Sequence, residues 1–236
     1  MTVVVLARHG ETGWSSQERF TGWADPPLTH RGEEQASRAG HALRDQGVVV
    51  ERAYSSALSR AERTARIMLA ASGAGGLPAA VDWRINERHL GRLQGMTKCE
   101  VTDIWGRELR RSWRDDAEAR PPALHRDHPD HPCHDPRYDH VPAGRLPGAE
   151  SRHETAERVL EFWHERVIPD VVDGRNVLVV AHLGPLRALA DHLKVLRSDR
   201  HPPSRWDHGE PHVCTLAPDS CCDPSFGRPR PRSRAC

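Results

Sequence analysis

Short apolar runs rich in β-branched residues alternate along the chain with longer stretches of helical period. Continuous short runs of this kind are typical of strands buried in a sheet, whereas the amphipathic stretches predict helices that cover it. The predicted strands are 3–7, 53–55, 80–83, 176–181 and 212–216.

Polar capping residues mark where the intervening helices begin, because a side-chain oxygen there accepts a free N–H of the first turn. Two of these signals are capping boxes, in which a Glu three residues on reaches back to the capping residue. The predicted helices are about 30–46 after Thr29, 60–71 capped by Ser59, one after Thr97 with Glu100, 152–167 after Ser151 with Glu154, and 185–195 with Pro185 in its first turn.

This alternation predicts an α/β fold, a three-layer αβα sandwich with a mostly parallel central sheet. A length of 236 residues fits one large domain, which we expect at 1–218. The segment 116–147 is rich in Pro, His, Asp and Arg without either period, so we expect a surface excursion that acts as a lid. We expect 219–236, which is rich in Pro, Arg and Cys, to be a disordered tail.

Composition and charge exclude several functional classes. Lys and Arg number 34 against 33 Asp and Glu, so no overall basic field favours a nucleic acid or an anionic membrane as partner. The first apolar run is too short for a signal peptide or a membrane span, and we therefore expect a cytoplasmic protein. Six cysteines without a C-x-x-C pair indicate reduced thiols rather than a disulfide framework.

Two histidines directly follow predicted strands: His9, in Arg8-His9-Gly10, and His182. The carboxyl ends of parallel strands are where α/β sheets place ligands. A neutral imidazole can attack phosphorus, and an arginine fork can stabilise phosphoryl oxygens by paired hydrogen bonds. Gly10 would let the backbone approach the anion closely. Considered alone, the tripeptide fits a structural strand-end histidine equally well.

Two other kinds of site are less well supported. The hydroxyls of Ser55 and Ser56 lack the G-x-S-x-G surroundings of a serine nucleophile. The segment 125–140 holds five histidines and Cys133, but prolines interrupt it and leave no helical face to align ligands. We therefore expect no metal site.

Seven separated segments resemble, in order, the cofactor-dependent phosphoglycerate mutases of the histidine phosphatase superfamily. They are Arg8-His9-Gly10-Glu11, Arg19-Phe20-Thr21-Gly22-Trp23, Ser56-Ala57-Leu58-Ser59-Arg60-Ala61, Asn86-Glu87-Arg88-His89, Leu93-Gln94-Gly95, His134-Asp135-Pro136-Arg137-Tyr138, and Ala181-His182 with Leu186-Arg187-Ala188-Leu189. The resemblance implies a phosphoglycerate mutase-like fold that interconverts 2-phosphoglycerate and 3-phosphoglycerate in glycolysis and gluconeogenesis. It also implies 2,3-bisphosphoglycerate as primer, small-molecule phosphoglycerates as partners and no metal, and leaves a homo-oligomer open.

The same resemblance implies roles for individual residues. His9 would become phosphohistidine and Glu87 would be the general acid and base. The residues that would clamp the transferring phosphoryl group are Arg8, Arg60 and His182. Those that would line the carboxylate and second phosphate are Thr21, Gly22, Arg88, Lys98 and, from the lid side, Arg114. The other predicted substrate-binding positions are Ser15, His89, Leu90, Asp115, Leu183 and Gly184.

Several substrate-binding positions depart from the pattern of the family. Ser15 stands for the usual Asn, Leu90 for Tyr, Asp115 for Arg, and Leu183-Gly184 for Gly-Asn. A carboxylate about 4 to 6 Å from a phosphate would repel it by up to about 3 to 4 kcal/mol at an effective dielectric of about 20. The usual helical tail is also missing, which should admit water to phosphohistidine. Two alternatives follow: a phosphomonoesterase on the same scaffold, and a degenerate phospho-ligand binder without turnover.

Overall fold

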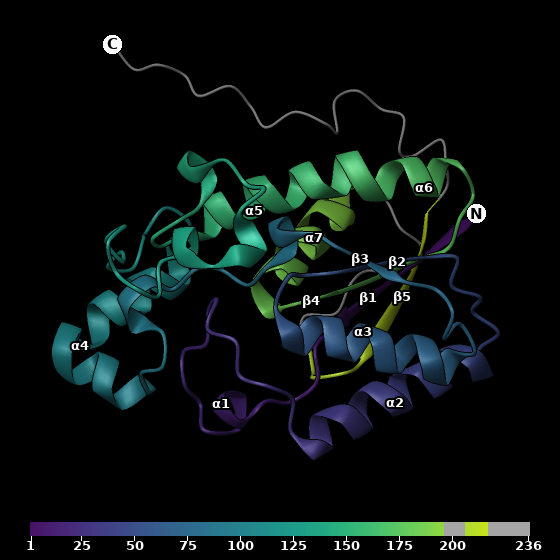
Figure 1. Cartoon of the computed structure of the whole chain (residues 1–236), viewed down its shortest axis with the longest axis horizontal. Helices are drawn as coiled ribbons and strands as arrows, with labels where there is room; N and C mark the ends of the chain where they lie inside the picture. The colour runs from purple at the N-terminus through teal and green to yellow at the C-terminus, as the bar shows by residue number, and fades with distance from the viewer. Residues whose placement is uncertain (196–205, 217–236) are drawn as a thin grey trace, which may run out of the picture.

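The computed structural model describes residues 1–195 and 206–216, and a five-stranded sheet forms its middle layer (Figure 1). The strand order is β3-β2-β4-β1-β5. The strands are β1 (Thr2–Arg8), β2 (Arg52–Ser55), β3 (Ala79–Val81), β4 (Val177–Ala181) and β5 (Pro211–Leu216). All neighbouring pairs are parallel except β1 with β5. The predicted strands and the mostly parallel sheet are therefore confirmed.

Helices cover both faces of this sheet, which confirms the three-layer sandwich (Figure 1). The pair α2 (His30–Asp45) and α3 (Ser59–Ser72) packs on one face. The other face carries α5 (Arg152–Phe162), α6 (Ile168–Val172) and α7 (Leu183–Val195). Outside these layers lie α1 (Gly13–Ser16) and α4 (Lys98–Asp115), the latter projecting beyond the edge of the sandwich.

The alternation of side chains along β1 joins the two cores. Val4 and Leu6 pack with α5, α6 and α7, while Val5 and Ala7 pack with α2 and α3. Successive side chains of a strand point to opposite faces, so a run that is apolar at every position suits a strand covered on both sides. Burying each such aliphatic side chain contributes roughly 1.5 to 3 kcal/mol. Sliding β1 along the sheet would lose this burial, so the position of its last residue in the sheet is fixed.

The predicted caps are confirmed with one exception. Thr29 caps α2, and Thr97 with Glu100 and Ser151 with Glu154 form complete capping boxes. The prediction for Ser59 is wrong, because the helix already begins at that residue and its N–H donates to the Asp25 carboxylate at 2.9 Å. A distant carboxylate thus takes the place of a local cap. Downstream, a π-helical turn at Trp163–Val167 carries α5 on into α6.

The segment 116–147 contains no α-helix or strand, only three short 3₁₀ turns at Pro132–His134, Pro136–Tyr138 and Ala143–Arg145. Tyr138 and Val141 are buried against Trp23 and Trp83, which attaches the excursion to the domain. The predicted tail, 219–236, lies outside the described residues. In the part of the chain described, no helix has the length and apolar character needed to cross a membrane.

Candidate active site

The two predicted site histidines meet at the carboxyl edge of the sheet. Arg8 and Ala181 are partners in the register of the parallel strands β1 and β4, so the next residues, His9 and His182, emerge side by side. Their ring centroids are 4.8 Å apart, and both side chains are buried. The neighbouring strands of the sheet therefore create this pair directly.

His9 is held in one tautomer. Its Nδ1 lies 2.7 Å from the carbonyl oxygen of Gly10, which can only accept, so Nδ1 carries the hydrogen and the lone pair is on Nε2. Burial lowers the pKa of His9 well below its ordinary value, and the charges of Arg60 and Arg8 lower it further. His9 is therefore neutral near pH 7, with Nε2 available as a nucleophile.

The guanidinium groups of Arg8 and Arg60 reach the same place and are only partly engaged. Arg60, 1% exposed, donates to the carbonyls of Gly22 and Ala24 at 2.8 and 2.7 Å. Burial lowers its pKa to about 10, so it remains a cation near neutrality. Arg8 donates to the carbonyl of Trp206 at 3.1 Å. The Nε atoms of both arginines are buried without a hydrogen-bond partner among the described residues.

His182 offers a further donor to the same space. Its Nε2 lies 2.7 Å from the hydroxyl of Ser56, and its Nδ1 is buried and has no partner in residues 1–195 and 206–216. Since Ser56 Oγ already accepts the N–H of Leu58 at 3.2 Å, its own hydrogen is free to donate to Nε2 of His182, and Nδ1 then carries the hydrogen. Buried donors without a partner are costly, and in an enzyme they indicate a place where an anion binds. Three such nitrogens around His9, from Arg8, Arg60 and His182, suit the oxygens of a phosphoryl group.

Glu87 is the carboxylate of this cluster. Its Oε1 accepts the backbone N–H groups of Arg88 at 2.9 Å and Gly184 at 3.1 Å. Burial lowers the pKa of both Arg8 and Arg60, and the charge of Glu87 opposes part of that lowering. A Cβ at position 184 would stand 2.5 Å from Oε1. Gly184 is thus required for the carboxylate to approach the α7 backbone. Gly184 lacks the amide side chain of the Asn that is usual at this position, but its backbone N–H still orients the carboxylate of Glu87.

Four other predicted substrate-binding residues contact protein atoms in this structure. Arg88 donates to the carbonyl of Trp113 at 2.7 Å, and Thr21 to that of Arg19 at 3.4 Å. Gly22 has φ of 55° with Gln94 packed against it. Leu183 is partly buried against the core on the α5 side of the sheet.

Four polar residues predicted to bind substrate contact neighbouring residues of the chain in this structure. Lys98, 51% exposed, forms an ion pair with Glu18 at 2.8 Å. Arg114 and Asp115 bind each other through two hydrogen bonds of 2.7 and 2.8 Å at the exposed end of α4. The repulsion expected from Asp115 is therefore offset within the pair. The Ser15 hydroxyl is used in the capping box of α1.

Three residues serve the architecture of the site rather than exposing a side chain to a ligand. His89 is fully buried, with Nδ1 accepting the N–H of Gly91 at 3.1 Å, and Leu90 packs in the cluster with Trp113. At Gly10 the structure shows a packing reason for glycine: its N–H donates to Thr64, and a Cβ there would lie 2.2 Å from the carbonyl oxygen of Gly32. Close packing of two loops requires this glycine.

The sequence interpretation missed His208. Its Nδ1 donates to the carbonyl of His9 at 2.9 Å, and the two ring centroids are 5.2 Å apart. The backbone N–H of Gly209 also donates to the carbonyl of Arg8 at 3.0 Å. The signal was the last strand: in the antiparallel register Ala7 faces Pro211, so the residues just before Pro211 must pass beside Arg8 and His9.

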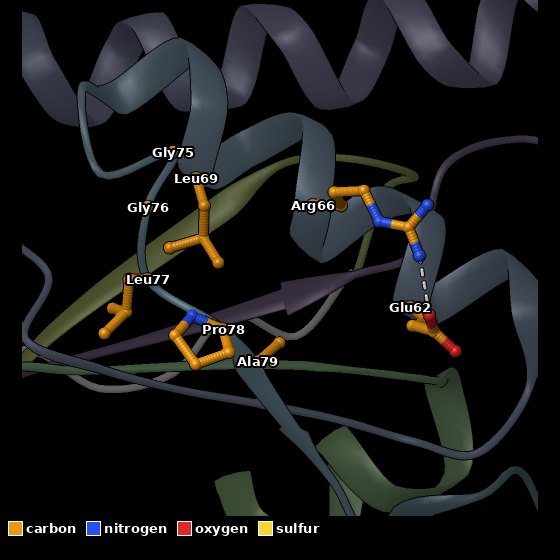
Figure 2. A pocket seen from close by; sticks show the side chains of 8 residues that line it. All are labelled: Glu62, Arg66, Leu69, Gly75, Gly76, Leu77, Pro78 and Ala79. Carbon is orange, nitrogen blue, oxygen red and sulfur yellow. Dashed lines mark hydrogen bonds and ion pairs between the residues drawn. The ribbon is translucent and has the colours of Figure 1, made fainter.

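A surface pocket of about 330 Å³ lies elsewhere, between α3 and the beginning of β3 (Figure 2). Its charged side chains, Glu62 and Arg66, are already paired at 2.7 Å, and the rest of its lining is small or apolar. Because β3 begins there, this pocket adjoins the amino edge of the parallel sheet. It contains none of the predicted site residues.

Burial of His89 predicts a pH dependence of stability. Burial lowers the pKa of His89 to about 3, whereas an unfolded histidine titrates near 6.5, so the unfolded state binds more protons between these values. The free energy of unfolding should therefore fall by about 1.4 kcal/mol per pH unit below about 6.5 on account of this residue. Urea titrations from pH 7.5 to 5 should show a shallower slope in His89→Asn, whose oxygen can still accept from Gly91. Equal slopes in the two proteins would contradict this assignment.

Comparisons with known proteins give the family. The family model described as "Histidine phosphatase superfamily (branch 1)" matches residues 4–132. The chain is 37% identical over 216 residues to a 2,3-bisphosphoglycerate-dependent phosphoglycerate mutase 1 of Lactobacillus johnsonii, covering 92% of this chain and 94% of the relative. A similarly named enzyme of Lactobacillus acidophilus shows the same identity and coverage.

Among solved structures, a mycobacterial glucosyl-3-phosphoglycerate phosphatase in complex with VO3 matches with a TM-score of 0.62 and 31% identity, over 82% of this chain and 81% of that one. The chain belongs to the histidine phosphatase superfamily.

Within the described residues, no group of three or more His, Cys, Asp or Glu is arranged to hold a metal ion.

Proposed function

We propose that the protein interconverts 2-phosphoglycerate and 3-phosphoglycerate through a phosphohistidine at His9. The observation that carries the proposal is the neutral imidazole of His9 beside three unpartnered buried nitrogens, with the Glu87 carboxylate bound to the N–H of Gly184, two residues after His182. The names of the relatives support the mutase reaction in particular. Its partners would be small-molecule phosphoglycerates, and its place would be glycolysis and gluconeogenesis in the cytoplasm.

In the proposed reaction, Nε2 of His9 attacks phosphorus as the bond from phosphorus to the substrate oxygen breaks. The electron pair of that bond goes to the leaving oxygen, which takes a proton from the carboxyl group of Glu87. Arg8, Arg60 and His182 donate to the phosphoryl oxygens and stabilise their charge as the group passes to His9. In the mutase cycle the primed enzyme acts in the reverse direction first: phospho-His9 gives its phosphoryl group to the free hydroxyl of 3-phosphoglycerate while Glu87 accepts the proton of that hydroxyl. His9 then takes the other phosphoryl group by the step described above, which releases 2-phosphoglycerate and restores the phosphorylated enzyme.

The unpartnered nitrogens of Arg8, Arg60 and His182 also fit one phosphate of 2,3-bisphosphoglycerate, the primer on which the named relatives depend. Arg88 directly follows Glu87 in the chain; burial lowers the pKa of Arg88, and the charge of Glu87 opposes part of that lowering. When bound, the bisphosphate supplies the phosphoryl group that makes the enzyme competent. Arg88 would hold its carboxylate or second phosphate.

A paired assay tests this proposal. Purified protein receives 3-phosphoglycerate with a trace of 2,3-bisphosphoglycerate, and 2-phosphoglycerate and inorganic phosphate are followed together. The proposal expects bisphosphate-dependent formation of 2-phosphoglycerate to exceed phosphate release by at least about tenfold. Dominant phosphate release would reject the mutase reaction while leaving transfer to His9 intact.

The second candidate is a phosphomonoesterase using the same histidine. It is favoured by Arg114, whose guanidinium is paired with Asp115 instead of being free for a second anionic group, and by the phosphatase among the similar structures. A phosphatase needs one phosphoryl site and access for water, so it tolerates loss of contacts to the far end of the substrate. Steady release of phosphate from several unrelated phosphoesters would select it.

A further inference from the structure

Arg158, on α5, has every N–H of its guanidinium bound. Nε and one Nη2 hydrogen donate to the two carboxylate oxygens of Glu150 at 2.6 and 2.7 Å. The remaining donors go to the backbone carbonyls of Arg84 and Asn86 through Nη1 and of Glu87 through Nη2, at 2.7, 2.8 and 2.9 Å. The side chains of Arg158 and Glu150 are only 5% and 6% exposed.

Glu150 ties down the other side of the same turn. Its Oε2 accepts the N–H of His89 at 2.7 Å, and its own N–H donates to the carbonyl of His89 at 2.8 Å. The indole N–H of Trp23 donates to the carbonyl of Glu87 at 2.5 Å. The backbone is thus fixed before, at and after Glu87, by three side chains from separate parts of the chain.

This arrangement is poorly explained as a device for stability alone. A buried ion pair loses hydration, and replacing both members with apolar side chains is often neutral or stabilising. Arg158 binds both carboxylate oxygens of Glu150, and its other three N–H groups donate to backbone carbonyls of one irregular turn. Such a planar, fully satisfied fork fixes geometry rather than merely filling space. The turn it fixes carries Glu87, whose carboxylate accepts the N–H of Gly184, two residues after His182, and interacts electrostatically with Arg8 and Arg60.

We propose that Arg158, oriented by Glu150, is a positioning residue that sets the Glu87 carboxyl group for proton transfer at the phosphoryl site. The inference rests on the proposed role of Glu87. A displacement of about 1 Å at a reacting group can cost about 100-fold in rate. Losing Arg158 should therefore slow the chemical step while leaving substrate affinity nearly unchanged, because Arg158 donates no hydrogen bond to a phosphoryl-site residue. Its charge contributes least among the causes that lower the pKa of His182, of which burial is the largest.

The test is a double-mutant cycle between Arg158→Met and Glu87→Gln, with 3-phosphoglycerate and a trace of 2,3-bisphosphoglycerate as substrates. Alone, Arg158→Met should lower kcat about 10- to 100-fold and change KM less than about threefold. In the Glu87→Gln background the same change should lower kcat less than about threefold, since no proton-transferring carboxyl group remains to be misplaced. Equal losses in both backgrounds would overturn the inference and assign Arg158 a merely structural role.

Two further variants keep the cycle interpretable. Arg158→Lys retains the cation but cannot reproduce the five bonds, and should show the same pattern if Arg158→Met is too unstable to purify.

Arg84→Met is the matched control, because it removes a buried guanidinium whose side chain binds Asp82, Glu161 and Glu165 but not Glu87. Its effect on kcat should be equal in both backgrounds. If Glu87→Gln alone retained full activity, the proposed role of Glu87 would fail, which is distinct from a failure of the positioning role.

Discussion

Replacing His9 with Asn should lower phosphoryl transfer by at least about 10⁴-fold and abolish acid-labile phosphate on the protein. Asn keeps a polar group near Nδ1 but has no atom at the position of Nε2, so the protein should fold while losing its nucleophile. The neutral state and fixed tautomer of His9, set by burial and by the carbonyl of Gly10, are what make Nε2 reactive. Activity and incorporation of labelled phosphate from 2,3-bisphosphoglycerate measure the loss.

His192→Asn is the matched control for this variant. His192 is a partly buried imidazole on α7, ten residues beyond His182, and its ring packs against that of His164. Its replacement should leave transfer within about threefold and label incorporation unchanged, because surface and peripheral substitutions rarely alter a rigid site. Labelling of the His9→Asn protein at the wild-type level would show that another residue is the nucleophile.

Glu87→Gln should lower kcat about 10²- to 10⁴-fold, the usual contribution of a general acid and base. The amide oxygen of Gln can still accept the N–H groups of Arg88 and Gly184, so the position of the side chain should be kept while proton transfer is lost. KM for 3-phosphoglycerate should change much less than kcat. Steady-state kinetics with the primer held constant give both numbers.

Glu161→Gln provides the comparison for the loss of one carboxylate. Glu161 forms ion pairs with Arg84 and Arg145 at the outer face of α5, away from the histidine pair. Neither ion pair includes a residue of the phosphoryl site, so kcat should stay within about twofold even though Arg84 itself is buried. A Glu87→Gln enzyme as active as Glu161→Gln would remove Glu87 from the mechanism and require another proton carrier.

The central part of the site was predictable because it follows from local pattern and from the rules of parallel sheets. The apolar run before His9 and the one before His182 each predict a buried strand, and adjacent parallel strands end at the same edge. The motif resemblance then singled out Glu87, Arg8 and Arg60, and the structure gathers these residues around His9.

The residues that support the site were not predictable in the same way. Asp25 caps α3 from 34 residues away, and Arg158 reaches the carbonyl of Glu87 across 71 residues. Every residue has a backbone carbonyl group, so no sequence motif shows which carbonyl a side chain such as Arg158 will bind. His208 became adjacent to His9 only through the antiparallel register of β5.

The contacts of charged side chains at the surface were the hardest to predict from the sequence. Lys98 and Arg114 have the residue type required for binding an anion, but each has a carboxylate within 2.8 Å in the chain itself. A long, flexible cationic side chain can pair with any carboxylate within its reach. The sequence does not show which carboxylate that is. Recruitment of either residue by a substrate would first require that pair to break.

The site of phosphorylation is the most direct test of the central claim. The protein is phosphorylated with 2,3-bisphosphoglycerate, the modified residue is located by mass spectrometry under alkaline conditions, and the linked nitrogen is identified by NMR of the labelled imidazole. Because Nδ1 of His9 donates to Gly10, the account predicts one phosphoryl group, on Nε2 of His9, that is transferred to added phosphoglycerate. Phosphate on Nδ1, on His182 or His208, or on no histidine at all would contradict it.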